Sequence, residues 1–321
     1  MALTAASSGY WPDIGVLVAS NSRPMPAPTA SIYANSPFHY FTTSLLSPHG
    51  RLLDLRRPQV MGILNLTPDS FFAGSRVASE KDLLTRAEAM LTTGAAVLDL
   101  GAYSTRPGAD DITEAEEMHR LLPAIAALRK EFPAAFLSAD TFRAGVAEAA
   151  VRAGADLVND VGGGTLDAGM FATVGRLRVP YVLMHLRGTP QTMAQLTHYA
   201  DDIVLELLRH FRDRLAQLRT AGVVDVLLDP GFGFAKTAAQ SHELLRRLPE
   251  LQALGLPLLA GLSRKRMVYG PLGLGPEAAL NGTTALHMVA LQGGARLLRA
   301  HDVAEARQTI DLFTNTFPIA E

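Results

Sequence analysis

Reactive and hydrogen-bonding side chains recur along this chain, each at or next to the end of a short apolar run. In chain order they are Asn65, Asp99, Asp140, Asn159 with Asp160, His185, Asp229, Ser263-Arg-Lys265, and Arg299 with His301. A single aspartate or asparagine in such a place is more often a helix cap or a turn residue than part of a site. Eight such places in succession are harder to explain in this way, so we interpret them as one candidate site.

These side chains suit two kinds of ligand. One group could surround a flat heterocycle with amide-like edges, because a carboxylate accepts two N–H donors in one plane and an asparagine both donates and accepts. Its members are Asp140, Asn159, Asp229 and Lys265. The other group suits a phosphate or pyrophosphate, because guanidinium groups bind such oxygens through two hydrogen bonds at once. Its members are Arg106, Arg264, Arg299 and His301.

The apolar runs alternate with helical patterns, and together they predict the elements that position these side chains. The runs are residues 60–64, 96–100, 135–139, 157–161, 181–184, 226–228, 258–261 and 296–299. Eight strand–helix units within about 260 residues predict a closed (β/α)8 TIM barrel, in which all strands end at one face. An open doubly wound sheet is the alternative, although no Gly-x-Gly-x-x-Gly follows the first run.

Local signals predict where several elements begin and end. Ser79-Glu-Lys-Asp82 has the form of a capping box, and Thr113-Glu-Ala-Glu116 is expected to open a second helix. A third helix has apolar residues at helical spacing from Ile203 to Leu218 and should stop at Gly222. Short apolar segments on both sides of Ser47-Pro-His-Gly50 predict a hairpin that could close the bottom of the barrel.

Composition separates the first 40 residues from the rest. Residues 1–40 are rich in Ala, Ser, Pro and Asn without a sustained period, so we expect an irregular N-terminal extension followed by a barrel domain at 41–321. No signal peptide or membrane-spanning run is expected. A net charge of −2 indicates no general attraction to nucleic acid or anionic membranes. The absence of cysteine excludes disulfides, zinc–thiolate sites and cysteine nucleophiles, and it fits the cytoplasm.

Five motifs of this chain are specific in combination. They are Met61-Gly-Ile-Leu-Asn-Leu-Thr-Pro-Asp-Ser-Phe71, Asp99-Leu-Gly-Ala-Tyr-Ser-Thr-Arg-Pro-Gly108, Asp229-Pro-Gly-Phe-Gly-Phe-Ala-Lys236, Gly261-Leu-Ser-Arg-Lys265 and Leu298-Arg-Ala-His-Asp-Val303. Together they resemble the dihydropteroate synthase family. The resemblance implies a pterin-binding barrel, commonly a homodimer, that makes 7,8-dihydropteroate for folate synthesis. Its substrates would be 6-hydroxymethyl-7,8-dihydropterin pyrophosphate and p-aminobenzoate, which sulfonamides resemble.

The resemblance also implies a role for each matching residue. The pterin would contact Asp140, Asn159, Met184, Asp229, Lys265 and Arg299. The pyrophosphate would contact Asn65, Arg106, Arg299 and His301, with Asn65 also facing Mg²⁺. p-Aminobenzoate would be held by Phe71, Thr105, Pro107, Phe234, Ser263 and Arg264. Asp140, Lys265 and Arg299 would be the catalytic residues, acting through fixed charges and without a covalent nucleophile.

Several positions depart from the pattern that is common in the family. They are Ala73, Tyr103, Ala235 and Gln240-Ser241, none of which is assigned to the pterin or the pyrophosphate. Two alternatives remain at this point. A methyltetrahydrofolate:corrinoid methyltransferase would share the heterocycle pocket but would not need the pyrophosphate residues. A non-catalytic pterin-binding paralogue would not need Asn65, Lys265 and His301 all to be present.

Overall fold

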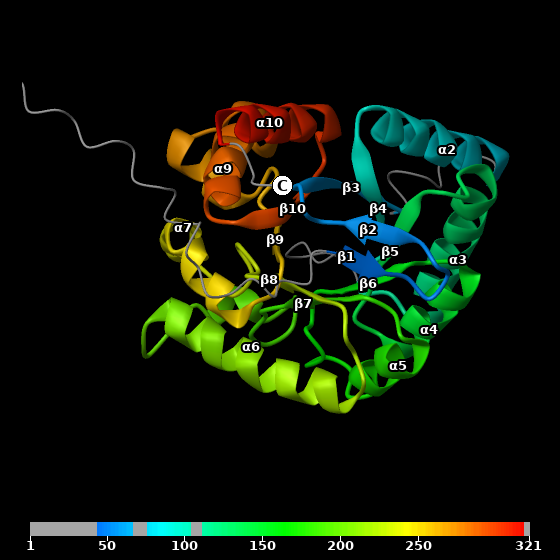
Figure 1. Ribbon diagram of the computed structural model, residues 1–321, viewed down its shortest axis with the longest axis horizontal. Helices are drawn as coiled ribbons and strands as arrows, with labels where there is room; N and C mark the ends of the chain where they lie inside the picture. Colours follow the sequence, from blue (N-terminus) through cyan, green and yellow to red (C-terminus); the bar gives the residue numbers. More distant parts are fainter. Residues whose placement is uncertain (1–43, 67–75, 104–110, 318–321) are drawn as a thin grey trace, which may run out of the picture. The chain divides into compact units, whose positions relative to one another are not determined.

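Eight parallel strands close into a barrel in the computed structural model, which describes residues 44–66, 76–103 and 111–317, with the backbone alone at 76–79. The strand order around the ring is β10-β3-β4-β5-β6-β7-β8-β9 (Figure 1). The strands are β3 (Gln59–Asn65), β4 (Ala95–Gly101), β5 (Phe136–Asp140), β6 (Leu157–Asp160), β7 (Tyr181–Met184), β8 (Val226–Asp229), β9 (Leu258–Ala260) and β10 (Ala295–Ala300). The predicted TIM barrel is therefore confirmed, and each predicted strand agrees with the observed one to within one residue at either end.

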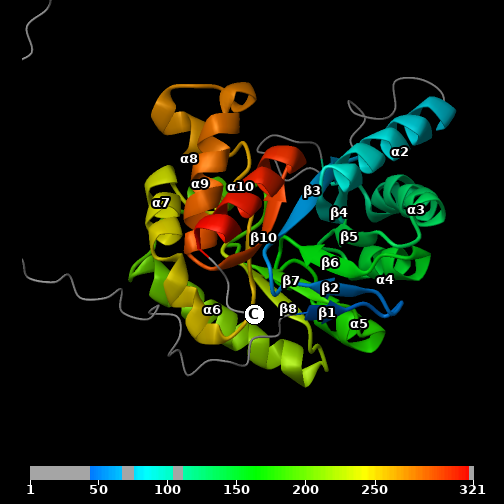
Figure 2. The same cartoon turned by 45° about the horizontal axis from the view of Figure 1, so that its top comes forward.

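Helices follow the strands and cover the outside of the barrel (Figures 1 and 2). The α-helices are α2 (Arg76–Thr92), α3 (Glu114–Glu131), α4 (Ala144–Ala153), α5 (Met170–Leu177), α6 (Ile203–Thr220), α7 (Ala238–Arg246), α8 (Arg266–Tyr269), α9 (Leu280–Gln292) and α10 (Val303–Thr316). Short 3-10 turns are η1 (Met193–Gln195), η2 (Leu248–Leu254), η3 (Gly270–Leu272) and η4 (Pro276–Ala278). None of the described helices is long and apolar enough to cross a membrane.

Two of the three predicted helix boundaries are confirmed. Thr113 caps α3, where its side chain accepts a hydrogen bond from the backbone N–H of Glu116. Helix α6 buries its predicted apolar face and is followed by Gly222 at a φ of 84°. The capping box at Ser79 is wrong, because α2 already begins at Arg76 and a capping residue must lie outside the helical conformation.

The predicted hairpin forms and seals the amino ends of the barrel strands. Strands β1 (Ser44–Leu46) and β2 (Leu52–Asp54) pair in antiparallel register, and Figure 1 shows them lying across the ring. Leu45, Leu53 and Leu55 are buried in one cluster with the inward-facing residues of the lower barrel. Those residues are Met61, Val97, Phe136, Leu157, Val182, Leu227, Leu259 and Leu297. The barrel is thus a packed core with its lower end closed.

The lower end also carries a buried charge cluster. Asp156 is fully buried and accepts from Arg51 Nε at 2.7 Å and from Arg129 Nη2 at 2.6 Å. Arg51 belongs to the hairpin turn and Arg129 to α3, so one carboxylate joins both to the start of β6. The extension at residues 1–40 lies outside the described residues, and the domain boundary at 41 stays a prediction.

Buried histidines give the folded state a dependence on pH. Neither ring nitrogen of His287 in α9 has a hydrogen-bond partner in the described part of the chain, and burial lowers the pKa of His287 to about 4. Since a histidine in the unfolded chain has a pKa near 6.5, the unfolded state binds more protons between these values. The free energy of unfolding is therefore not reduced by His287 above pH 6.5. It decreases as the pH falls from 6.5 toward 4, because the unfolded chain takes up the proton first.

We therefore expect His287→Leu to gain stability relative to the wild type on acidification. The gain should approach roughly 3 kcal/mol between pH 7 and pH 4, which is the shift converted at about 1.4 kcal/mol per pKa unit. Urea unfolding of both proteins across this range measures it. The same substitution at the exposed His119 is the control. A wild-type minus variant difference that stays constant with pH would contradict the assignment.

Candidate functional site

The alternation of strand residues decides which polar side chains enter the barrel. Successive residues of a strand point to opposite faces, so a residue two positions after an inward-facing apolar residue also points inward. This relation joins Val97 to Asp99, Leu157 to Asn159, Leu227 to Asp229 and Leu297 to Arg299. These polar residues form a layer directly above the apolar lower layer, at the carboxyl ends of the strands where TIM barrels carry their sites.

Arg299 is the centre of this layer. Its Nε donates to Asp99 Oδ2 at 2.6 Å and its Nη2 donates to Asp140 Oδ2 at 2.7 Å. Asn159 Nδ2 donates to the same oxygen of Asp99 at 3.0 Å. Asp99 is fully buried, and its other oxygen has no hydrogen-bond partner within the described residues. The network joins four strands, and it includes Asp99, which the sequence pattern places in the candidate site without assigning it a ligand.

Burial changes the acidity of Asp140. It raises the pKa of Asp140 to about 7, an effect that the nearby Arg299 opposes and that the negative charge of Asp99 increases. The carboxyl group therefore changes between its neutral and charged forms near neutral pH. A ligand that offers N–H donors to this carboxylate would favour the charged form.

Lys265 and Asp229 meet on the opposite side of the layer. Lys265 Nζ donates to the carbonyl of Phe232 at 2.7 Å and lies 4.5 Å from the centroid of the Phe234 ring. A Cβ atom on Gly261 would lie 3.7 Å from Asp229 Oδ2 and 3.8 Å from Lys265 Nζ, so the two charged groups approach the same point. Burial lowers the pKa of Lys265 to about 8, while burial raises the pKa of Asp229.

An apolar wall adjoins these groups. Met184 ends β7 and is buried in a cluster with Val161, Leu186, Met193 and Ala235. The Phe234 ring packs against this cluster. Asn65 ends β3, where it is half-buried and lies in register with Gly101. The structure thus places Asn65 and Met184 at the same end of the barrel as the charged network.

Ser263 and His301 form a separate pair at this end. Ser263 Oγ lies 3.1 Å from His301 Nδ1 and accepts a hydrogen bond from the backbone N–H of His301 at 3.2 Å. The neighbouring Arg264 makes two hydrogen bonds to Asp302, at 2.9 and 2.6 Å. The predicted phosphate-binding cation at 264 is therefore already paired with a carboxylate in this structure. Phe71, Thr105, Arg106 and Pro107 lie outside the described residues.

Two further residues at strand ends, Asp160 and His185, have local hydrogen-bond partners. Asp160 faces away from the barrel interior, where it accepts from the Tyr181 hydroxyl and from the N–H groups of Gly162 and Gly164. This is the ordinary turn-forming role of an aspartate at such a place. His185 directly follows β7, is almost completely buried, and contacts Lys236 at 2.9 Å between Nδ1 and Nζ.

The departures from the common family pattern have local partners. The Tyr103 hydroxyl accepts from Gln191 Nε2 at 2.8 Å, and its ring packs edge-on against Phe142. Gln240 completes a capping box with Thr237 at the start of α7. Ser241 Oγ accepts from the backbone N–H of Gly233 at 3.2 Å. Tyr103, Gln240 and Ser241 thus fit the surrounding structure, while Ala73 lies outside the described residues.

The Gly231 position requires glycine for two reasons. Its φ is 68°, and a Cβ atom there would lie 2.3 Å from the backbone oxygen of His185. Gly255 has the same φ of 68°, yet a Cβ atom there would meet nothing within 4 Å. A substitution at Gly255 therefore introduces backbone strain alone, whereas one at Gly231 adds a steric collision.

We expect Gly255→Ala to cost about 1–2 kcal/mol of stability, the usual cost of an L-residue in the left-handed region. Gly231→Ala should cost clearly more, because the backbone must also move away from the His185 carbonyl. Chemical denaturation of both variants measures the difference. Equal losses of stability in the two variants would show that the backbone after β8 moves away from the His185 carbonyl at no free-energy cost.

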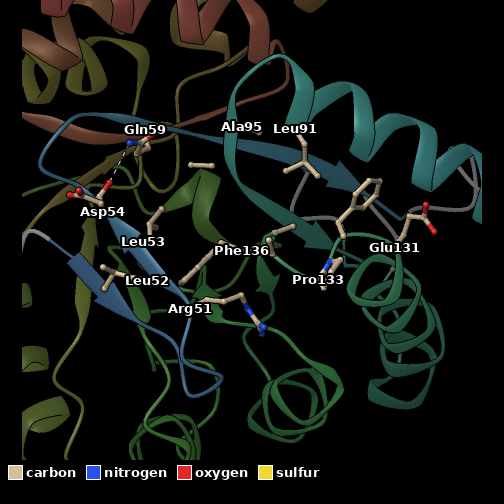
Figure 3. Close-up of a pocket in the computed structure, with 14 residues that line it drawn as sticks. Arg51, Leu52, Leu53, Asp54, Gln59, Leu91, Ala95, Glu131, Pro133 and Phe136 are labelled. Carbon is tan, nitrogen blue, oxygen red and sulfur yellow. Dashed lines mark hydrogen bonds between the residues drawn. The ribbon is translucent and has the colours of Figure 1, made fainter.

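A groove of about 730 Å³ lies at the other end of the barrel. Figure 3 shows it between the hairpin, the start of β4 and the end of α3, with Arg51, Leu53, Leu91, Pro133 and Phe136 among its lining. Leu53 and Phe136 belong to the apolar lower layer. The groove therefore adjoins the amino ends of the strands, away from the polar layer, and it is not part of the candidate site.

Comparison with known proteins agrees with this geometry. Residues 61–301 match the family model described as pterin binding enzyme. The dihydropteroate synthase of Synechocystis sp. is 44% identical over 256 residues, which are 79% of this chain and 88% of that protein. The Escherichia coli K12 dihydropteroate synthase is 37% identical over 278 residues, 86% and 98% of the two chains.

Solved structures give the same result. The Yersinia pestis dihydropteroate synthase in a sulfonamide drug complex superposes with a TM-score of 0.79 at 39% identity, covering 85% of this chain and 98% of that one. The Xanthomonas albilineans dihydropteroate synthase with 4-aminobenzoic acid has a TM-score of 0.79 at 40% identity, covering 87% and 99%. In each case the match extends over nearly the whole of the solved chain.

Proposed function

Because this chain belongs to the dihydropteroate synthase family of pterin-binding enzymes, we propose that it joins 6-hydroxymethyl-7,8-dihydropterin pyrophosphate to p-aminobenzoate. The products would be 7,8-dihydropteroate and pyrophosphate. The observation that carries the proposal is the network of Arg299 with Asp99, Asp140 and Asn159, facing the Asp229–Lys265 pair at the carboxyl ends of the strands. It combines planar hydrogen-bonding groups with half-buried cations in one layer.

The pterin ring would lie in this layer. Asp140, Asn159 and Asp229 supply acceptors, or in the case of Asn159 both donor and acceptor, for the amide-like edges of the heterocycle. Lys265 would donate to a ring acceptor. Met184 would pack on one face of the ring, and the planar guanidinium of Arg299 would stack on the other. The low exposure of Asn159, Met184 and Asp229 supports a site from which water is largely excluded.

The pyrophosphate would be bound by Asn65, Arg106, Arg299 and His301. Mg²⁺ prefers oxygen ligands and in proteins is usually held by few side chains together with substrate phosphates and water. In the described part of the chain no group of three or more histidine, aspartate or glutamate residues could hold a metal, whereas the Asn65 amide offers one oxygen. The donor set thus fits Mg²⁺ only together with phosphate oxygens, and when bound the ion would neutralise charge on the departing pyrophosphate.

The p-aminobenzoate ring would lie beside the pterin. Phe234, Ser263 and Arg264 are the described residues assigned to it. Phe71, Thr105 and Pro107 belong to the two segments outside the described residues. The Phe234 ring already contacts Lys265, so the two substrate positions adjoin at this lysine. Arg264 would reach the benzoate carboxylate only by sharing or leaving its bonds to Asp302.

The chemistry follows from where charge develops. The bond between the pterin methylene carbon and the pyrophosphate oxygen breaks, and its electron pair leaves with pyrophosphate. The lone pair of the amine nitrogen forms the new carbon–nitrogen bond, and that nitrogen then loses one proton to water. Asp140 would stabilise the cation on the pterin, while Arg299 would stabilise the leaving group. Fixed charges of this kind are usually the largest contribution to catalysis.

Three further features are proposed on the family resemblance alone. The protein would be a homodimer in the cytoplasm, and sulfonamides would compete with p-aminobenzoate. A sulfonamide drug complex is known for the Yersinia pestis relative. Gel filtration with light scattering and competition kinetics test the first and last of these features.

A pyrophosphate-release assay tests the proposed reaction. We expect release only with both substrates and Mg²⁺ present, with one dihydropteroate formed for each pyrophosphate. Pterin binding without release would indicate the non-catalytic paralogue. Methyl transfer from methyltetrahydrofolate to a corrinoid, with no use of the pyrophosphate substrate, would indicate the methyltransferase. Either result would overturn the proposal.

A further inference from the structure

Lys236 is a buried lysine behind the site, and the chemistry above gives it no role. Its side chain is largely enclosed, at 6% exposure. The Nζ atom donates to the carbonyls of Gly231 and Phe234, both at 3.0 Å, and lies 2.9 Å from His185 Nδ1. A charged lysine has three N–H donors. Each donor thus has a partner at normal hydrogen-bond distance.

The partners of Lys236 belong mainly to one loop, residues 230–235 between β8 and α7. Gly231, Gly233 and Ala235 have positive φ angles of 68°, 77° and 49°. An alanine in this conformation costs about 1–2 kcal/mol, so it persists only where the surroundings impose it. The bonds from Lys236 to the carbonyls at 231 and 234 are part of what imposes it.

The other side of this loop faces the substrate positions. The carbonyl of Phe232 accepts from Lys265 Nζ at 2.7 Å, and the Phe234 ring lies under the same Nζ. Lys236 therefore holds residues 231 and 234 from behind, while Lys265 contacts residues 232 and 234 from the front. A displacement of the loop would move both the phenyl wall and the acceptor that orients Lys265.

We propose that Lys236, held by His185, is a positioning residue for the aromatic amine substrate. It fixes the loop at residues 230–235 so that Phe234 and Lys265 have the geometry that binds p-aminobenzoate. The proposal rests on the proposed function for the identity of that substrate. It predicts that loss of the Lys236–His185 contact weakens p-aminobenzoate binding more than pterin binding, because the proposed pterin contacts Asp140, Asn159 and Arg299 lie outside the loop.

The charge of Lys236 depends on groups that several elements contribute. Burial lowers the pKa of Lys236 to about 7, the carboxylate of Asp229 raises it, and the cations Lys265 and Arg187 lower it further. The imidazoles of His185 and His210 complete the surroundings, and burial lowers the pKa of both. A neutral amine is a weaker donor than an ammonium group, so its bonds to the loop carbonyls weaken and KM for p-aminobenzoate should rise as the pH rises through 7.

The experiment compares Lys236→Met with a pair of variants at its partner. His185→Leu removes the acceptor, whereas His185→Asn places an amide oxygen where Nδ1 stood. Lys130→Met, at an exposed lysine of α3, is the matched control. Turnover kinetics give KM for p-aminobenzoate and kcat, and calorimetry gives Kd for the pterin substrate.

We expect Lys236→Met to raise KM for p-aminobenzoate by about tenfold or more, the usual effect of losing one hydrogen bond to a charged group. Kd for the pterin substrate should rise by a smaller factor, since Asp229 and Lys265 bond to the loop whereas Asp140, Asn159 and Arg299 do not. The rise of KM near pH 7 should be missing in this variant. His185→Leu should show the same change to a smaller degree, and His185→Asn should restore KM toward the wild-type value.

Hydrogen exchange supplies a readout that needs no substrate. Peptides covering residues 230–236 should exchange faster in Lys236→Met, while β6 stays protected. Equal weakening of both substrates, a lower Tm alone, or unchanged exchange in the loop would overturn the inference. If Lys236→Met does not fold, the two His185 variants decide between the same outcomes. Failure of the wild type to use p-aminobenzoate would instead overturn the proposed function.

Discussion

Lys265→Ala should lower turnover by about 10²–10³-fold, the range found when one preorganised donor is removed from an active site. Lys265 Nζ lies at the meeting point of Asp229, the Phe232 carbonyl and the Phe234 ring. Its loss removes a contact to the pterin and frees the loop that borders the second substrate. The fold should persist, because the cation is one of several groups at the upper end and the lower core is untouched.

Steady-state pyrophosphate release and thermal melting measure the two effects of Lys265→Ala separately. Lys130→Ala is the control, since Lys130 lies exposed on α3 and a surface substitution there should change stability by no more than about 0.5 kcal/mol. A folded Lys265→Ala protein with turnover close to the wild type would remove this residue from the site.

Arg299→Met should lose both activity and stability. The substitution removes the cation between Asp99 and Asp140 and leaves one fully buried and one half-buried carboxyl group without their partner. Breaking a buried pair in this way typically costs about 3–5 kcal/mol. Because Arg299 lowers the pKa of Asp140, that pKa should rise further in the variant, and the loss of stability should be larger at high pH than at low pH.

Arg296→Met provides a control on the same strand. Arg296 donates to the carbonyl of Arg56 and does not contact either carboxylate. Urea unfolding at pH 5 and pH 8 compares the two variants, and the double variant Arg299→Met with Asp99→Asn should recover part of the lost stability. An Arg299→Met protein as stable as Arg296→Met at both pH values would show that the buried pair contributes nothing.

The barrel could be predicted from the sequence because its signal is local. Each strand is a short apolar run bounded by polar residues, and this pattern persists whatever the neighbouring strands are. The error at Ser79 has a local cause as well. Ser79 is followed by exposed residues such as Glu80 and Asp82, and such residues occur equally on the outer face of a helix interior.

The contacts within the site could be predicted only in part. Asp140, Asn159 and Arg299 were expected together, and the structure brings them together through Asp99. The hydrogen bonds that Asp99 accepts could not be predicted from its position, because their donors Asn159 and Arg299 lie 60 and 200 residues further along the chain. Lys236 was missed for a related reason: its acceptors are backbone carbonyls, which leave no mark on the sequence. The substrate roles of the individual residues stay predictions.

The Asp99–Arg299 network has a consequence for ligand selection. Backbone hydrogen bonds join each strand only to its neighbours in the ring. The side-chain bonds that Arg299 donates to Asp99 and Asp140 instead cross the barrel interior and join strands that are not neighbours. A ligand that enters this space competes with these side-chain hydrogen bonds and must offer equivalent donors and acceptors. A ligand that lacks a matching group leaves a charged side chain without a partner. The free-energy cost of such an unpaired group is larger than the gain from a correct contact. Discrimination would therefore arise mainly from rejection of near-analogues.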